Sequence, residues 1–119
     1  IQNQTIKEIM KRTEKENYIL ISAENAELTD FTSQLTKHHQ DFESSNIIVD
    51  LSNHKDLENQ QLLAFLEVSN LHRESNKSFV IVNDALGIDE LPEELIVVPT
   101  LQEAEDMIQM DEIQRDLGF

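Results

Sequence analysis

Short apolar runs alternate along this chain with segments that have helical spacing. Four runs rich in β-branched residues predict strands: residues 18–21, 47–51, 78–82 and 95–98. The run at 47–51 is almost wholly apolar, which is typical of a central strand covered on both faces. Residues 6–13 are open to two interpretations, a leading strand or an N-terminal helix.

Helical spacing predicts a first helix within residues 26–42. Leu28, Phe31, Leu35 and then His38 or His39 recur there at intervals of three and four. A second helix is expected from a cap at Asp56 through the leucine-rich stretch that ends at Leu71. Residues 84–88 suit one further helical turn.

The last helix has the clearest local signal. Thr100 and Glu103 form a capping box, in which the Thr100 hydroxyl accepts from the Glu103 amide and the Glu103 carboxylate accepts from the Thr100 amide. Leu101, Ala104 and Ile108 mark an apolar face that we expect Ile113 and Leu117 to extend, and Gly118 suits the end.

Residues 110–119 read as a C-terminal helical extension. Its apolar side chains can either pack back onto the domain or form an exposed patch for self-association or for a partner; they are Met110, Ile113, Leu117 and Phe119.

Together these elements predict a single α/β domain over residues 1–119. Strands that alternate with helices favour a largely parallel or mixed sheet. We expect a mixed β-sheet of four to five strands with helices packed on it.

The net charge of −15 is concentrated in the last third of the chain. Residues 84–119 hold eleven acidic residues and one basic residue, Arg115. Nucleic acid and anionic membrane surfaces attract the opposite charge, so we expect neither as a partner. The acidity can serve solubility alone, or it can complement a basic protein.

The residues for common enzyme chemistry are sparse. The chain has no cysteine, and its two glycines cannot build a phosphate-binding loop. The four histidines lack the i, i+4 spacing of a helical zinc site, so we expect no metal and no cofactor. Asp50, Ser52 and His54 suggest a nucleophile with a base, but alternate polar residues in a strand-to-helix loop explain them better, and we expect no enzyme activity.

Residues 46–108 resemble a STAS domain, the module of anti-sigma-factor antagonists and sulphate-transporter tails. The resemblance rests on an apolar strand ending in Asp50-Leu51-Ser52, the leucine-rich helix, the strand at 79–83, and the strand-to-helix passage at 97–104. The helix near Leu28 extends it towards the N-terminus.

The family's phosphorylated motif, Asp-Ser-Ser-Gly-Leu-Gly, is altered here. With Leu62 on the motif's leucine, Glu58 takes the aspartate position, Asn59 and Gln60 the serine positions, and Gln61 the first glycine position. The chain therefore offers no hydroxyl at that point for the charge switch that phosphorylation provides.

The resemblance implies a non-catalytic protein-interaction module similar to an anti-sigma-factor antagonist and not switched by phosphorylation. The absence of cysteine fits a reducing compartment, and we expect a cytoplasmic protein. Its expected contact residues surround the second helix start: Asn53, His54, Glu58, Asn59, Gln60 and Gln61. Two alternatives remain open, an accessory subunit of an enzyme and a structural homodimer formed through the C-terminal helix.

Overall fold

A computed structural model of the chain describes residues 10–23, 28–52, 54, 59–84 and 95–118. Its centre is a five-stranded sheet, in which the strands follow one another in chain order. The strands are β1 (Met10–Glu14), β2 (Tyr18–Ala23), β3 (Asn46–Asp50), β4 (Phe79–Val82) and β5 (Ile96–Val98). β1 pairs antiparallel with β2, and the other pairs are parallel, so the predicted mixed α/β sheet is confirmed. The leading segment is a strand over residues 10–14.

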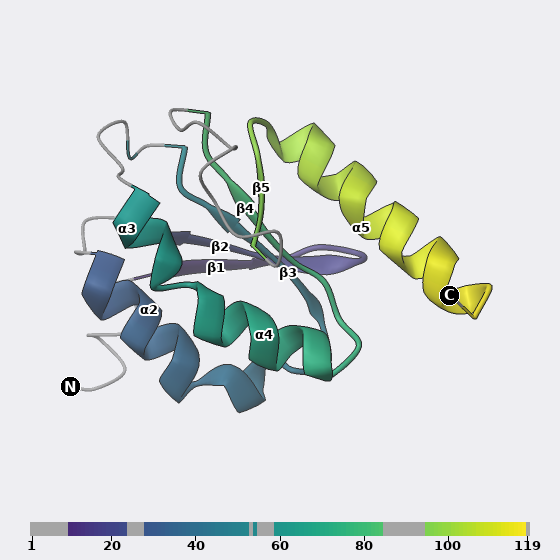
Figure 1. Ribbon diagram of the computed structural model, residues 1–119, viewed down its shortest axis with the longest axis horizontal. Helices are drawn as coiled ribbons and strands as arrows, with labels where there is room; N and C mark the ends of the chain where they lie inside the picture. Colours follow the sequence, from purple (N-terminus) through teal and green to yellow (C-terminus); the bar gives the residue numbers. More distant parts are fainter. Residues whose placement is uncertain (1–9, 24–27, 53, 55–58, 85–94, 119) are drawn as a thin grey trace.

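Helices cover the two faces of the sheet unequally (Figure 1). One face carries α2 (Leu28–Lys37), α3 (Asn59–Leu63) and α4 (Leu66–Glu74), with a short 3₁₀ turn, η1 (His39–Asp41). The other face carries α5 (Leu101–Asp116). The domain is therefore a three-layer α/β/α structure in the described part of the chain.

Alternation along the strands divides the core between these faces. The larger cluster lies under α2, α3 and α4 and includes Ile19, Ile21, Phe31, Leu35, Phe42, Ile47, Val49, Leu51, Leu62, Phe65, Val68, Phe79, Ile81, Leu95 and Val97. The smaller cluster lies under α5 and contains Tyr18, Ile48, Val80, Val82, Ala104 and Ile108. The continuous apolar run predicted for β3 thus serves both faces, as expected of a central strand.

The predicted second helix is divided into α3 and α4. The amide of Phe65 donates to the Leu62 carbonyl at 2.9 Å, a three-residue step that interrupts the four-residue helical ladder. This tighter turn brings both Leu62 and Phe65 fully into the core. Asn76, with φ of 62°, then ends the segment in the left-handed conformation, as a helix-terminating asparagine can.

The start and end of α5 follow the prediction. The Thr100 hydroxyl accepts from the Glu103 amide at 3.2 Å, which is the first half of the expected capping box. Gly118 has φ of 84°, in the left-handed region that glycine tolerates best. The helix continues without a break through residue 110 to Asp116.

The predicted apolar face of α5 is confirmed at Ala104 and Ile108, but it is wrong at Leu101, which is 37% exposed, and beyond Ile108. Met110, Ile113 and Leu117 are 56%, 58% and 66% exposed, so these three side chains do not pack back onto the domain. The half-buried positions are instead the polar Asp111, Glu112 and Arg115. Here the helix passes over the amino-terminal ends of β3 and β4, where its neighbours are Asn46 and Ser78. Residue 119, residues 1–9 and the predicted turn beyond Asp84 lie outside the described residues.

Candidate functional site

The carboxyl ends of β3, β4 and β5 are joined by hydrogen bonds from the side chain and the backbone amide of one buried residue, Asn83. Its Nδ2 donates to the carbonyl oxygens of Leu51 at 2.9 Å and His54 at 3.1 Å. Its backbone amide donates to the Val98 carbonyl at 2.9 Å. Asn83 therefore holds the described start of the loop after β3, at Leu51 and His54. Sequence reasoning did not select it, although a polar residue directly after an apolar strand was a usable signal.

Asp50 has a structural task in the same loop. Its Oδ1 accepts from the Ser52 backbone amide at 2.9 Å, which is the hydrogen bond of an Asx turn. The His54 amide closes the next turn on the Leu51 carbonyl at 2.9 Å. These bonds place Asp50, Ser52 and His54 in two consecutive turns after β3.

The predicted contact residues are described in part. His54 is half-buried in this loop, and Gln61 is exposed on α3. Asn59 and Gln60 form the first turn of α3, although their side chains are outside the described part. Asn53 and Glu58 lie outside the described residues altogether.

The short helix α3 separates its side chains sharply between core and solvent. Leu62 is fully buried, while its neighbours Gln61 and Leu63 are exposed, Leu63 to 42%. Ala64 is exposed beside them. α3 thus presents a small apolar surface next to neutral polar groups at the carboxyl edge of the sheet.

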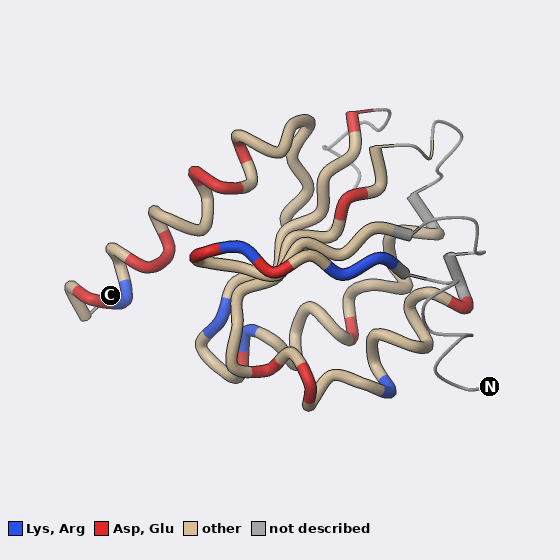
Figure 2. The backbone as a smooth tube through the Cα atoms, turned by 180° about the vertical axis from the view of Figure 1, so that it is seen from behind, with Lys and Arg blue, Asp and Glu red and all other residues tan. Residues whose placement is uncertain are grey.

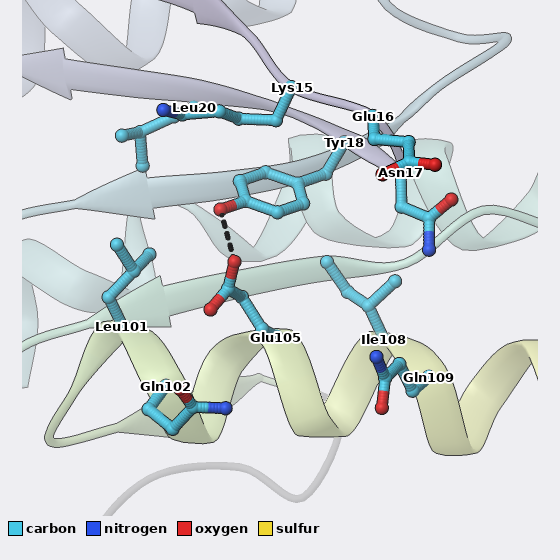
Figure 3. A pocket seen from close by; sticks show the side chains of 10 residues that line it. All are labelled: Lys15, Glu16, Asn17, Tyr18, Leu20, Leu101, Gln102, Glu105, Ile108 and Gln109. Carbon is cyan, nitrogen blue, oxygen red and sulfur yellow. Dashed lines mark hydrogen bonds between the residues drawn. The ribbon is translucent and has the colours of Figure 1, made fainter.

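A groove of about 460 Å³ lies between β2 and α5 (Figure 3). Its lining combines apolar and polar side chains: Lys15, Glu16, Asn17, Tyr18, Leu20, Leu101, Gln102, Glu105, Ile108 and Gln109. It exists because α5 lies chiefly over β4, with fewer neighbours on β3 and β5. Sequence reasoning could not find this groove, since it depends on where α5 crosses the sheet.

Tyr18 and Glu105 connect β2 to α5 inside this groove. The Tyr18 hydroxyl donates to Glu105 Oε2 at 2.7 Å (Figure 3). Burial, followed by the hydrogen bond and the negative charge of Glu105, raises the pKa of Tyr18 to about 12. Tyr18 therefore stays protonated at neutral pH and acts here as a hydrogen-bond donor.

A second, more polar hollow of about 540 Å³ adjoins this groove near the amino-terminal ends of β2 and β3, and residues 15–18 line both. Asn46 closes part of it, since its Nδ2 donates at 3.1 Å both to the Asn17 carbonyl and to Glu112 Oε1. Arg12 and Lys77 line the hollow together with acidic Glu14 and Asp41. This mixture of charges gives the hollow no single ligand preference.

Next to this hollow, His72 is fully buried in a fixed tautomer. Its Nε2 donates to the Ser45 carbonyl, so its Nδ1 is left to accept from His39 Nε2 at 3.1 Å. Burial lowers the pKa of His72 to about 4, and the charges of His39, Lys77 and Arg115 add to this effect against the Ser45 hydrogen bond. His72 is thus neutral over the physiological range and ties η1 to α4.

Within the described residues, no group of three or more histidine, cysteine or acidic side chains is placed to hold a metal ion. None of the helices in that part of the chain has the length and apolar character needed to cross a membrane. No protein-family model and no curated protein gave a significant match to the chain, so its similarity to STAS domains stays a prediction from the sequence pattern.

Proposed function

We propose that the chain is a non-catalytic protein-interaction module that contacts its partner through the start of α3 and the loop before it. In this proposal the module resembles an anti-sigma-factor antagonist. It differs in lacking a phosphorylation switch, because Asn59 and Gln60 occupy the positions of the family's serines.

The observation that carries this proposal is the arrangement of side chains on α3. Full burial of Leu62 fixes the rotation of the helix, and this rotation turns Gln61 and Leu63 towards solvent. An exposed leucine bordered by neutral polar groups has the composition of an interface, in which apolar contacts are surrounded by a polar rim. Strongly charged groups, which are depleted at interface centres, are absent from the described residues of α3.

The loop before α3 supports the same proposal, because its described part is already ordered by hydrogen bonds. Asn83 holds the Leu51 and His54 carbonyls, and Asp50 holds the Ser52 amide. A surface that is ordered before binding loses less conformational entropy when a partner arrives. The buried Asn83 is thus a positioning residue for the contact region.

A matched pair of substitutions tests this proposal. Gln61→Arg adds a long, charged side chain to α3, and Gln40→Arg makes the same change on exposed η1 at the other end of the sheet. After affinity purification from the cells that make the protein, we expect Gln61→Arg to lose a partner that both the wild type and Gln40→Arg retain. If Gln61→Arg and Asn59→Arg both retain every partner in wild-type yield, α3 is not the contact region.

A further inference from the structure

The outer face of α5 carries an apolar stripe that the fold leaves in solvent. Met110, Ile113 and Leu117 are each more than half exposed. Their spacing of three and four residues places them on one side of the helix, over a length of about 10 Å. Exposed apolar groups that gather in this way indicate an interaction surface more often than single exposed leucines do.

The opposite side of α5 is fixed to the sheet by polar contacts. The Ser78 hydroxyl donates to Asp111 Oδ2 at 2.6 Å and accepts from Arg115 at 2.9 Å. Asn46 donates to Glu112 one step along the helix. Because these contacts determine the rotation of α5, the stripe faces outwards as a consequence of the fold.

Acidic residues lie near the two ends of the stripe, while Gln109 and Gln114 beside it are neutral. Glu103, Asp106 and Asp116 are exposed, and acidic positions recur along the whole helix (Figure 2). The one basic residue of α5, Arg115, is half-buried and bonded to Ser78. The outer face of α5 is therefore apolar along its middle and negative towards its ends.

This charge decides between the possible occupants of the stripe. A second copy of the chain would bring like acidic ends and a net charge of −15 against the first, so charge repulsion opposes it. An anionic lipid surface would be repelled in the same way. A helix with an apolar face flanked by lysine or arginine complements both the stripe and its acidic ends.

We propose that the outer face of α5 docks a basic amphipathic helix of a partner protein. Met110, Ile113 and Leu117 form the apolar contact, and Asp106 and Asp116 attract the basic flanks. This surface lies on the other side of the sheet from α3, so it is a second docking surface, distinct from that of the proposed function. Variants on α3 and on α5 therefore test the two proposals separately.

The test uses a synthetic helical peptide of about 18 residues, long enough to span the stripe, with leucine on one face and lysine on the other. Nuclear magnetic resonance of the labelled chain should show amide shifts concentrated within residues 106–117. Calorimetry should show at least a tenfold loss of affinity for the triple variant Met110→Ser, Ile113→Ser and Leu117→Ser. The control Leu71→Ser removes an exposed leucine from α4, outside both proposed docking surfaces, and should leave affinity unchanged.

A second variant keeps the test valid if the triple variant does not fold. Asp106→Asn with Asp116→Asn leaves the stripe intact and should weaken binding and reduce its salt dependence. Three results would overturn the proposal: shifts spread over acidic positions throughout the chain, equal affinity for the wild type and the variants, or a wild-type dimer that the stripe variants convert to monomer. The last result would make a second copy the occupant.

Discussion

Buried polar side chains in this protein differ in how completely they are hydrogen-bonded. Asn46 uses both ends of its amide, and Ser78 both donates and accepts. Ser69, by contrast, is fully buried on α4, and its hydroxyl has no hydrogen-bond partner among the described residues. A buried polar group costs free energy unless it is bonded, so these serines should respond in opposite ways to the same substitution.

Ser69→Ala should therefore stabilise the protein by up to about 1 kcal/mol, because it removes an unsatisfied hydroxyl and favours the helix. Ser78→Ala should destabilise it by about 1–3 kcal/mol, because Asp111 and Arg115 both lose the hydroxyl that they share. Urea unfolding of the two variants gives the comparison directly. Equal effects of the two substitutions would contradict this assignment of the hydrogen bonds.

The pKa of Tyr18 can be measured directly by ultraviolet absorbance, since Tyr18 is the only tyrosine and the chain has no tryptophan. Ultraviolet absorbance of the phenolate should titrate near the pKa of about 12 rather than at 10. Glu105→Gln should lower this midpoint but leave it above 10, because burial is the largest cause of the shift. Circular dichroism at each pH shows whether the fold persists, and a midpoint at 10 in folded protein would exclude the buried hydrogen bond.

His72 should make the protein sensitive to mild acid. Its pKa falls from 6.5 to about 4 on folding, so the unfolded chain takes up a proton first as the pH decreases. The contribution of neutral His72 to the free energy of unfolding is complete above pH 6.5. It is lost progressively towards pH 4, as the histidine of the unfolded chain becomes protonated. At pH 5 this loss is about 2 kcal/mol.

Urea unfolding between pH 7.5 and 5 measures that loss. The slope of the unfolding free energy against pH should be smaller in His72→Gln than in the wild type. An unchanged slope in His72→Gln would show that other groups cause the acid sensitivity.

Among the elements, α5 shows best what the sequence could and could not predict. Its cap at Thr100 and its end at Gly118 depend on neighbouring residues, so the local pattern was sufficient. Its inner face beyond Ile108 depends on Asn46 and Ser78, which are distant in the chain. A periodicity argument assigns Ile113 to the core because it assumes an apolar neighbour there.

No local sequence signal predicted that the second helix would be divided into α3 and α4. Neither glycine nor proline marks the turn at Ala64 and Phe65. The tight turn allows Leu62 and Phe65 to enter the same core, which is a property of the packing rather than of the local sequence. For the same reason, the local sequence could not predict the exposure of Leu63 in the candidate contact region, because it depends on where α3 ends.

At the scale of the whole molecule, the two faces of the sheet have different surroundings. α2, α3 and α4 cover one face, while α5 leaves the groove beside β2 open (Figure 3). The two proposed docking surfaces lie in different layers, α3 in one and the outer side of α5 in the other. The chain could therefore contact two partners, or two parts of one partner, at the same time.

Hydrogen exchange of the chain, with and without the partner that co-purifies with it, tests the central proposal most directly. Binding through α3 predicts that the backbone amides within residues 59–64 exchange more slowly in the complex, since the partner excludes water and suppresses local opening. Gln40 and its neighbours in η1 should exchange at the same rate in both states. Unchanged exchange within residues 59–64, with slower exchange elsewhere in the chain, would contradict the proposal.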